Sequence, residues 1–345
     1  FPIRNPGAPR PVSRGAAMKV VLANPRGFCA GVVRAIEIVE LALERFGPPI
    51  YARHDIVHNQ HVVADFVARG VVFVEDLQDV PPGVRVIFSA HGVGPAIWRQ
   101  AADRALPVID ATCPLVVKVH QEVAAYARAG CTVFLIGHRS HPEIIGTLGH
   151  YDGHPDRIHV IETVEEADCV TAVNPDDVAY ATQTTLALDA VAPIVAVLSR
   201  RFPRLRAPHA ADICYATQNR QRAVRSLVET SDVVLVVGAR QSSNSMRLCE
   251  VAQASGVPAY LADCADAVRR EWFSAADTIG LTSGASVPEL LVTQVLDRLR
   301  EWWPELAVIS IGEPETLQFR LPRSLEQDAQ AAAPSVKPAP FAQRA

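Results

Sequence analysis

The stretch from Val20 to Pro49 reads VVLANPRGFCAGVVRAIEIVELALERFGPP. It opens with a short apolar run, passes through a small polar loop and continues with apolar residues at spacings of four and three as far as Phe46. That spacing predicts a helix with one face packed on a sheet, and Gly47 followed by Pro48 predicts its end. We therefore expect strand, loop and helix in this order, the unit from which layered α/β proteins are built.

The same succession recurs from Met18 to about Leu317, which predicts an α/β fold throughout. A second helix is expected from Pro114 to Ala129, with Gly130 as its stop. Several of the expected strands are wholly apolar, as strands covered on both faces are, so we expect mainly parallel sheets. The expected strands are Val20–Leu22, Val84–Phe88, Thr132–Ile136, Val178–Ala181, Val233–Val237 and Thr278–Leu281.

The two ends of the chain differ in composition from the rest. Residues 1–17 are rich in Arg and Pro and lack the apolar stretch of a secretory signal, so we expect a disordered N-terminal extension. Residues 321–345 consist largely of Ala, Pro, Gln and Ser and cannot bury enough apolar surface to offset the entropy of ordering. We expect a disordered C-terminal tail there.

Composition and charge narrow the class of protein. The 345 residues are 49% hydrophobic, enough for substantial cores, and the formal charge of −4 is not gathered in blocks. Neither a nucleic acid nor a membrane is therefore expected as a partner. No apolar run approaches the roughly 20 residues that a membrane span needs. The seven cysteines lack tight spacing, which favours reduced thiols and a cytoplasmic location over a disulfide framework.

Three cysteines occupy the same kind of corner, between a strand or loop and the start of a helix. They are Cys29 in PRGFCAGV, Cys113 in DATCPLV and Cys214 in DICYATQ. A helix N-terminus stabilises a thiolate and prepares it to bind a metal. Zinc with three thiolates and a water fits this pattern, and so does a four-iron cluster with one open iron. The remaining cysteines are interpreted as small buried apolar residues: Cys131, Cys169, Cys249 and Cys264.

Polar loops follow several of the predicted strands. At the carboxyl ends of parallel strands such loops can converge on one pocket, and hydroxyl, amide and imidazole groups suit a phosphate or diphosphate. Glu143 differs in kind, because a desolvated carboxyl can donate a proton. The simpler interpretation is helix capping for the hydroxyls and a solvated surface for Arg220 and Arg222. The candidate residues are His58, His91, His141, Glu143, Thr184, Thr185, Ser242, Ser243, Asn244 and Ser286.

Taken together, these motifs closely resemble the IspH/LytB family of 4-hydroxy-3-methylbut-2-enyl diphosphate reductases. The resemblance runs in the family's order from Met18 to Leu299. Two small departures are Arg240–Gln241, where a Lys–Asn pair is commoner, and Ser283 in place of a small apolar residue. The motifs that carry it are PRGFCAGV, HNQHVV, FSAHGV, DATCPLV, GHRSHPE, TQTTL, DICYATQNRQ, VVGARQSSNS and TSGASVPE.

The resemblance implies three pseudo-equivalent α/β domains, residues 18–113, 114–210 and 211–320, around a central iron–sulfur cluster. It implies that Cys29, Cys113 and Cys214 bind a [4Fe-4S] cluster, which oxidation can convert to [3Fe-4S]. It also implies that the polar residues above line the substrate pocket, with the serines, Asn244 and the first two histidines around the diphosphate. Glu143, helped by His141 and Thr184, is then the proton source.

The implied reaction is the reductive dehydroxylation of (E)-4-hydroxy-3-methylbut-2-enyl diphosphate to isopentenyl and dimethylallyl diphosphate, the last step of the non-mevalonate isoprenoid pathway. A ferredoxin or flavodoxin-type electron donor is implied as well, because no nicotinamide or flavin fingerprint is present. Two alternatives use the same thiols: a zinc-dependent hydrolase, which consumes no electrons, and a non-catalytic iron–sulfur sensor, which needs no diphosphate pocket.

Overall fold

The computed structural model describes residues 18–322 and Leu325. They form two compact units, which are described separately. The five-strand unit combines residues 18–29 with 215–317, and the seven-strand unit comprises residues 30–214 together with the described residues from 318 onward. Every strand pairing recorded for the described residues is parallel, which confirms the predicted α/β class.

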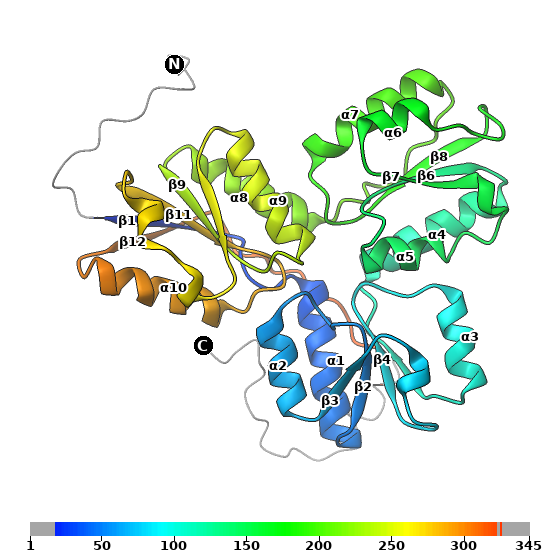
Figure 1. Ribbon diagram of the computed structural model, residues 1–345, viewed down its shortest axis with the longest axis horizontal. Helices are drawn as coiled ribbons and strands as arrows, with labels where there is room; N and C mark the ends of the chain where they lie inside the picture. The colour runs from blue at the N-terminus through cyan, green and yellow to red at the C-terminus, as the bar shows by residue number, and fades with distance from the viewer. Residues whose placement is uncertain (1–17, 323–324, 326–345) are drawn as a thin grey trace. The chain divides into compact units, whose positions relative to one another are not determined.

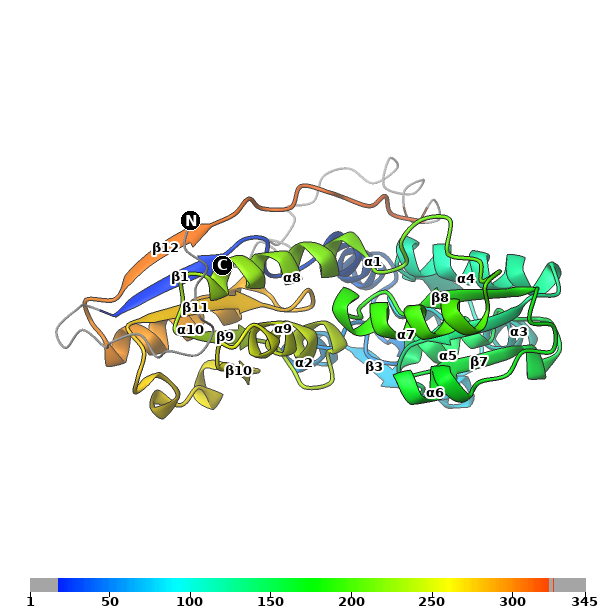
Figure 2. The same ribbon diagram turned by 90° about the horizontal axis from the view of Figure 1, so that it is seen from above.

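The five-strand unit is built on one sheet with the order β10-β9-β11-β1-β12. Figures 1 and 2 show β1 and β12, which lie far apart in the sequence, side by side in this sheet. The strands are β1 (Lys19–Ala23), β9 (Val233–Val237), β10 (Ala259–Ala262), β11 (Thr278–Ser283) and β12 (Ala307–Ile311).

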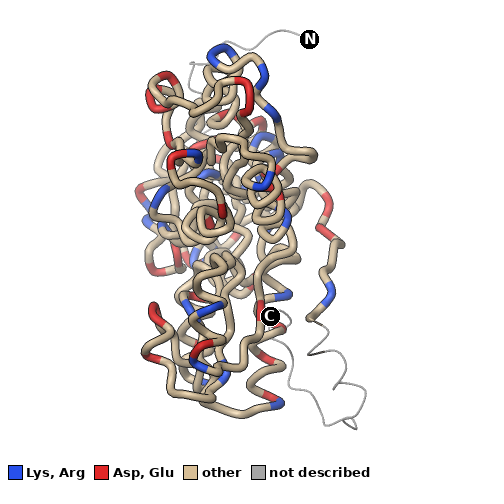
Figure 3. The backbone as a smooth tube through the Cα atoms, turned by 90° about the vertical axis from the view of Figure 1, so that its right-hand side faces the viewer, with Lys and Arg blue, Asp and Glu red and all other residues tan. Residues whose placement is uncertain are grey.

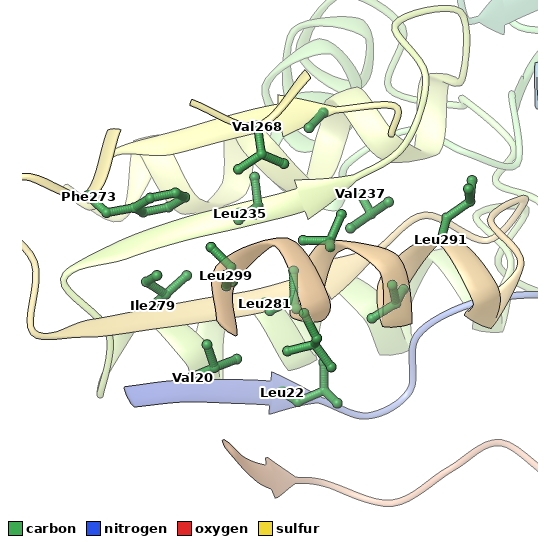
Figure 4. Packing of buried hydrophobic residues seen from close by; sticks show 14 of the residues in the cluster. Val20, Leu22, Leu235, Val237, Val268, Phe273, Ile279, Leu281, Leu291 and Leu299 are labelled. Carbon is green, nitrogen blue, oxygen red and sulfur yellow. The ribbon is translucent and has the colours of Figure 1, made fainter. Parts of the chain in front are cut away.

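Helices cover both faces of that sheet, because its central strands alternate between two cores. In β9, Val233, Leu235 and Val237 pack on α10 (Glu289–Trp302). Figure 4 shows Leu235 and Val237 in this core. The intervening Val234 and Val236 pack on the other side, against α8 (Tyr215–Val228) and α9 (Ser243–Ala254). Two short 3-10 turns, η3 (Ala265–Ala267) and η4 (Arg270–Phe273), follow β10.

The seven-strand unit contains two sheets, of which the first has the order β3-β2-β4-β5. In its core, Val86 and Phe88 of β4 pack with Ala101 of the third helix. The elements are α1 (Ala30–Phe46), β2 (Ile50–Arg53), α2 (Gln60–Ala68), β3 (Val71–Val74), η1 (Leu77–Asp79), β4 (Val86–Phe88), α3 (Pro95–Asp103) and β5 (Val108–Asp110).

The second sheet of this unit has the order β7-β6-β8 and alternates in the same way. Val133 and Leu135 of β6 share a core with α4 and α5, whereas Phe134 and Ile136 share the other with α6 and α7. The elements are α4 (Pro114–Arg128), β6 (Thr132–Ile136), α5 (Pro142–Leu148), η2 (Pro155–Arg157), β7 (Ile158–Ile161), α6 (Val164–Cys169), β8 (Val178–Thr182) and α7 (Leu188–Arg201).

All six strands expected from the sequence are present, and both expected helices correspond to α1 and α4. Six further strands were not among those expected: β2, β3, β5, β7, β10 and β12. All of these except β2 lie at the edge of a sheet, where one side of the strand is unpaired. An edge strand is only partly covered and does not need a wholly apolar run. This accounts for β7 (IHVI) and β12 (AVISI), whereas β3 (VVFV) is apolar although it lies at an edge.

The structure differs from the predicted domain division at its start. Residues 18–113 were expected to form one domain, but β1 pairs with β11 and β12 and so belongs to the five-strand sheet. The reason is long-range strand pairing: Lys19 to Leu22 pair with Thr278 to Leu281. More residues separate β1 from β11 in the sequence than residues 30–214 contain, so no local pattern could reveal this pairing. The other predicted boundaries stay a prediction.

The predicted tail is partly contradicted. Leu325 is 2% exposed, its N–H donates to the carbonyl of Pro322, and its own carbonyl accepts from Arg45. An isolated leucine in a polar segment gave no periodic signal, so the sequence could not show that it packs. The rest of the tail, residues 323–324 and 326–345, and the predicted extension of residues 1–17 lie outside the described residues.

Two further observations concern the distribution of charge and the character of the helices. Basic and acidic residues are interspersed along the backbone in Figure 3. Within residues 18–322 there is no helix that combines the length and apolar character needed to cross a membrane.

Candidate active site

Each of the three cysteines picked out from the sequence directly precedes a helix. Cys29 precedes α1, Cys214 precedes α8, and Cys113 is the N-cap of α4 with Pro114 in the first turn. None of the three forms a disulfide, and all three are partly exposed. Each thiol therefore lies at the positive end of a helix dipole and is accessible to a metal.

The backbone of each cysteine is fixed to a polar loop that follows a strand. In every case the cysteine N–H donates to a carbonyl of a loop that carries candidate substrate residues. The three hydrogen bonds are Cys29 to Ala285 at 3.1 Å, Cys113 to Ala90 at 3.0 Å and Cys214 to Thr184 at 3.0 Å. The repeated contact means that each thiol is positioned together with its neighbouring polar loop.

Three histidines from separate loops gather in the seven-strand unit. The rings of His58 and His91 stack with centroids 4.1 Å apart, and His141 lies edge-on to them at 5.4 and 5.7 Å. Ser89 Oγ lies 3.3 Å from Nδ1 of His91, and Asn59, next to His58, caps α2. Sequence reasoning singled out all three histidines, but only the fold shows that their rings touch.

The histidine cluster is neutral at pH 7. Burial first, and repulsion from nearby imidazoles second, lower the pKa of His58 to about 4 and that of His141 to about 3. Burial also places the pKa of His91 well below its usual value, with repulsion from His58 and His141 as the next causes. Because Nδ1 of His141 accepts the N–H of Glu143 at 3.2 Å, a neutral His141 carries its proton on Nε2.

Glu143 lies beside this cluster and is held by a single residue. Its Oε1 accepts the N–H of Thr184 at 2.6 Å, and its Oε2 accepts the hydroxyl of the same residue at 3.0 Å. The side chain is 3% exposed, and burial raises its pKa to about 7, although the two hydrogen bonds from Thr184 act in the opposite direction. A carboxyl of this kind exchanges a proton near neutral pH.

The loop before Cys214 contains a residue that sequence reasoning missed. Asp212 is 4% exposed, accepts the N–H of Thr182 at 2.8 Å and pairs with Lys118 of α4 at 2.8 Å. It therefore ties the Cys214 loop to the end of β8 and to the Cys113 helix. A single Asp two residues before a cysteine gave no signal by itself.

A second set of candidate residues gathers in the five-strand unit around Ala285. Oδ1 of Asn244 accepts the N–H of Ala285 at 2.8 Å, and Ser286 is the next residue. Ser242 is the N-cap of α9 and accepts the N–H of Ser245 at 3.4 Å, while Ser243 opens that helix. Serine capping, the simpler interpretation, is therefore present for Ser242.

Asn244 has one donor that nothing in the described residues uses. The side chain is 4% exposed, and Nδ2 is buried without a hydrogen-bond partner in residues 18–322 or Leu325. The hydrogen bond from Ala285 fixes which atom is oxygen, so the amide nitrogen is the unmatched group. A buried unmatched donor is costly, and a ligand oxygen would relieve that cost.

The cysteines fall in both units: Cys29 in the five-strand unit, Cys113 and Cys214 in the seven-strand unit. Across the described part of the chain, no three His, Cys, Asp or Glu side chains gather closely enough to hold a single metal ion. A cluster of several irons differs from a single metal ion, since each iron takes its own thiolate.

Thr185, another candidate residue, lies in the seven-strand unit. Its Oγ1 accepts a hydrogen bond from Nε2 of Gln183 at 2.9 Å.

Two expectations about residues outside the site were wrong. Among the cysteines interpreted as buried, Cys131 and Cys249 are buried, but Cys169 is exposed at the end of α6 and Cys264 is half-buried. Arg220 is not solvated: its side chain is 0% exposed and pairs with Glu315 at 2.9 Å, whereas Arg222 is exposed as expected. A lone Arg in a polar helix does not show that its partner is nearly a hundred residues away.

Comparisons with known proteins agree with the resemblance seen in the sequence. The model of the LytB protein family matches residues 20–300. The 4-hydroxy-3-methylbut-2-enyl diphosphate reductase of Azotobacter vinelandii is 53% identical over 309 residues, which cover 89% of this chain and 98% of that protein. That of Acinetobacter baylyi is 51% identical over 312 residues, with the same coverage.

Solved structures give the same family. The E-1-hydroxy-2-methyl-but-2-enyl-4-diphosphate reductase of Plasmodium falciparum is 37% identical with a TM-score of 0.86, covering 91% of this chain and 99% of that one. A structure of (E)-4-hydroxy-3-methyl-but-2-enyl diphosphate reductase, the terminal enzyme of the non-mevalonate pathway, is 30% identical with a TM-score of 0.60 and covers 82% of this chain and 99% of that one. With matches that span nearly the whole of its relatives, the chain belongs to the LytB family.

Proposed function

We propose that this chain reduces (E)-4-hydroxy-3-methylbut-2-enyl diphosphate to isopentenyl and dimethylallyl diphosphate, the last step of the non-mevalonate isoprenoid pathway. The relatives that it matches over 98% of their length carry this reductase name. In the reaction an allylic C–O bond breaks, the hydroxyl leaves as water, and a C–H bond forms. Two electrons and two protons are consumed, one proton for the water and one for carbon.

The observation that carries this proposal within the structure is the buried carboxyl of Glu143. With a pKa of about 7 it carries a proton in about half of the molecules at neutral pH, in a place from which bulk water is largely excluded. Thr184 orients both carboxyl oxygens, and His141 binds the backbone N–H of Glu143. Glu143 is therefore the proton donor to the leaving hydroxyl, with His141 and Thr184 as its partners.

We assign the binding of the substrate's diphosphate to uncharged hydrogen-bond donors. His58, His91 and Asn244 offer N–H groups without adding positive charge, and the hydroxyls of Ser242, Ser243, Thr185 and Ser286 supplement them. The unmatched Nδ2 of Asn244 supports this part of the proposal most directly. Neutral donors bind an anion without the strong, nonspecific attraction that a cluster of Lys and Arg would exert on every phosphate.

We assign Cys29, Cys113 and Cys214 as the ligands of a [4Fe-4S] cluster. Their thiols fit this role because each is partly exposed, forms no disulfide and lies at the start of a helix. When bound, such a cluster supplies electrons singly and a Lewis-acidic iron without a protein ligand. A small ferredoxin or flavodoxin-type protein is the expected electron donor. The alternative is a zinc-dependent hydrolase that uses the same three thiols. It differs from the proposed enzyme because it consumes no electrons.

Mössbauer spectroscopy tests the proposal. The protein is labelled with iron-57, purified without oxygen, and recorded with and without the hydroxylated allylic diphosphate. We expect a four-iron cluster in which one iron changes its environment when the diphosphate is added. Absence of iron, or zinc in its place, would refute the reductase assignment. A cluster that is indifferent to the diphosphate would favour a sensor.

A further inference from the structure

Gly27, two residues before Cys29, has both its backbone N–H and its backbone carbonyl hydrogen-bonded to buried side chains. Its N–H donates to Oγ of Ser283 at 2.8 Å, and its carbonyl accepts from Nη2 of Arg220 at 2.8 Å. Both side-chain partners are 0% exposed. We call this arrangement the Gly27 clamp; all of its members lie in the five-strand unit.

The backbone at Gly27 suits such a clamp only because it is glycine. Its φ is +69°, in the left-handed region that other residues rarely adopt. That conformation turns the N–H toward the end of β11 and the carbonyl toward α8. With the N–H of Cys29 bound to Ala285 as well, the backbone just before the thiol is fixed at three points.

Arg220 is itself anchored, so it can fix the loop. Its Nη1 donates to the carbonyl of Ala216 at 3.0 Å and pairs with Glu315 at 2.9 Å. Glu315 also accepts from Nδ2 of Asn219 at 3.0 Å. A guanidinium taken out of water needs such partners, because an unpaired buried charge is strongly destabilising. Because the Arg220 guanidinium is fixed by these partners, its hydrogen bond to the Gly27 carbonyl holds that carbonyl in one position.

Ser283 is the second half of the clamp, and its neighbour provides the contrast. Thr282 is equally buried, but its Oγ1 has no hydrogen-bond partner among the described residues. The hydroxyl of Ser283 is used for the loop of Cys29, while that of Thr282 is not. At position 283 a small apolar residue would leave the buried N–H of Gly27 without its acceptor.

We infer that Ser283 and Arg220 are positioning residues that present Cys29 to its metal. The inference rests on the proposed function in one respect, since it takes Cys29 as a cluster ligand. Groups that orient a metal ligand affect metal retention and electronic structure more than overall fold, because they act on the ligand's direction. A purely structural role would lower thermal stability and leave the bound cluster's spectrum unchanged.

The test compares Ser283→Ala and Arg220→Lys with the matched controls Thr282→Val and Arg222→Met. Thr282→Val removes a hydroxyl from the adjacent buried position, and Arg222→Met removes an exposed Arg from the same helix. Each protein is reconstituted with iron and sulfide without oxygen. Iron loss to a chelator, the EPR spectrum of the reduced cluster, and the melting temperature of the metal-free protein are measured.

We expect both clamp variants to lose iron at least about tenfold faster than the wild type and to show a shifted EPR spectrum. Both controls should keep the wild-type rate and spectrum. Wild-type iron loss and spectrum in Ser283→Ala would overturn the inference, even if Arg220→Lys failed to fold. A wild-type protein that takes up no cluster would instead refute the proposed function, which separates the two failures.

Discussion

Glu143 and Thr184 form a closed pair in which one threonine donates both its backbone N–H and its hydroxyl to one carboxyl, at 2.6 and 3.0 Å. The same threonine offers its carbonyl to the N–H of Cys214. The pair therefore connects the proposed proton donor to a proposed cluster ligand through a single residue. Any movement of the loop after β8 would shift both groups together.

Replacing Glu143 by Gln should separate substrate binding from turnover. Glutamine keeps the size of the side chain and can still accept from the N–H of Thr184, but it cannot release a proton. We expect kcat to fall by about 10²- to 10⁴-fold, with little change in the dissociation constant of the diphosphate measured by calorimetry. The matched control is Glu122→Gln, a buried carboxyl bound to the N–H of His209 at 2.9 Å. If Glu143→Gln turns over as fast as the control, Glu143 is not the proton donor.

The pH dependence of kcat should follow the carboxyl of Glu143. Its pKa is raised to about 7, so about nine tenths of the protein carries this proton at pH 6 and about one tenth at pH 8. A general acid works only when protonated, and kcat should therefore decrease as the pH rises through about 7. The measurement is a steady-state assay from pH 6 to 9 with a chemical reductant. A rate that increases over this range would contradict the assignment.

The three proposed ligand cysteines should behave alike and differ from the buried ones. Cys29→Ser, Cys113→Ser and Cys214→Ser are each expected to lose iron after reconstitution, because a serine hydroxyl is a poor replacement for a thiolate. Cys131→Ala and Cys249→Ala should keep iron; burial raises the pKa of Cys249 to about 12, so that thiol stays protonated. Iron and sulfide analysis of the five variants decides the question, and the opposite pattern would remove the ligand assignment.

Asn244→Asp should weaken substrate binding specifically. The carboxylate can still accept the N–H of Ala285, but it replaces the unmatched amide donor with a negative charge that repels a diphosphate. A buried charge–charge conflict of this kind costs several kcal/mol, so we expect KM to rise by at least about tenfold. The control is Asn174→Asp, an exposed position outside the site. Equal KM values in the two variants would mean that Asn244 does not contact the substrate.

Most of the candidate residues could be proposed from the sequence, because the motifs themselves carry the relevant chemistry. Cys29, Cys113 and Cys214 could be found from their place before predicted helices, and Glu143 from its loop. Arg220 and Asp212 could not be found, because each is defined by a partner distant in sequence: Glu315 for the first, Lys118 for the second. Ser283 was noted only as a departure from the family pattern, and its contact with Gly27 appears only in the fold.

By itself, the sequence determined the α/β class, the strands with the clearest apolar runs, such as β6 and β9, and the helices that begin near Gly31 and at Pro114, because apolar periodicity is a local property of the chain. Only the tertiary structure decided that β1 joins the sheet of residues 215–317 and that Leu325 is buried. It also decided that three histidines touch and that burial brings the pKa of Glu143 to about 7. Strand pairing and desolvation depend on which distant segments meet, and no local pattern of residues contains that information.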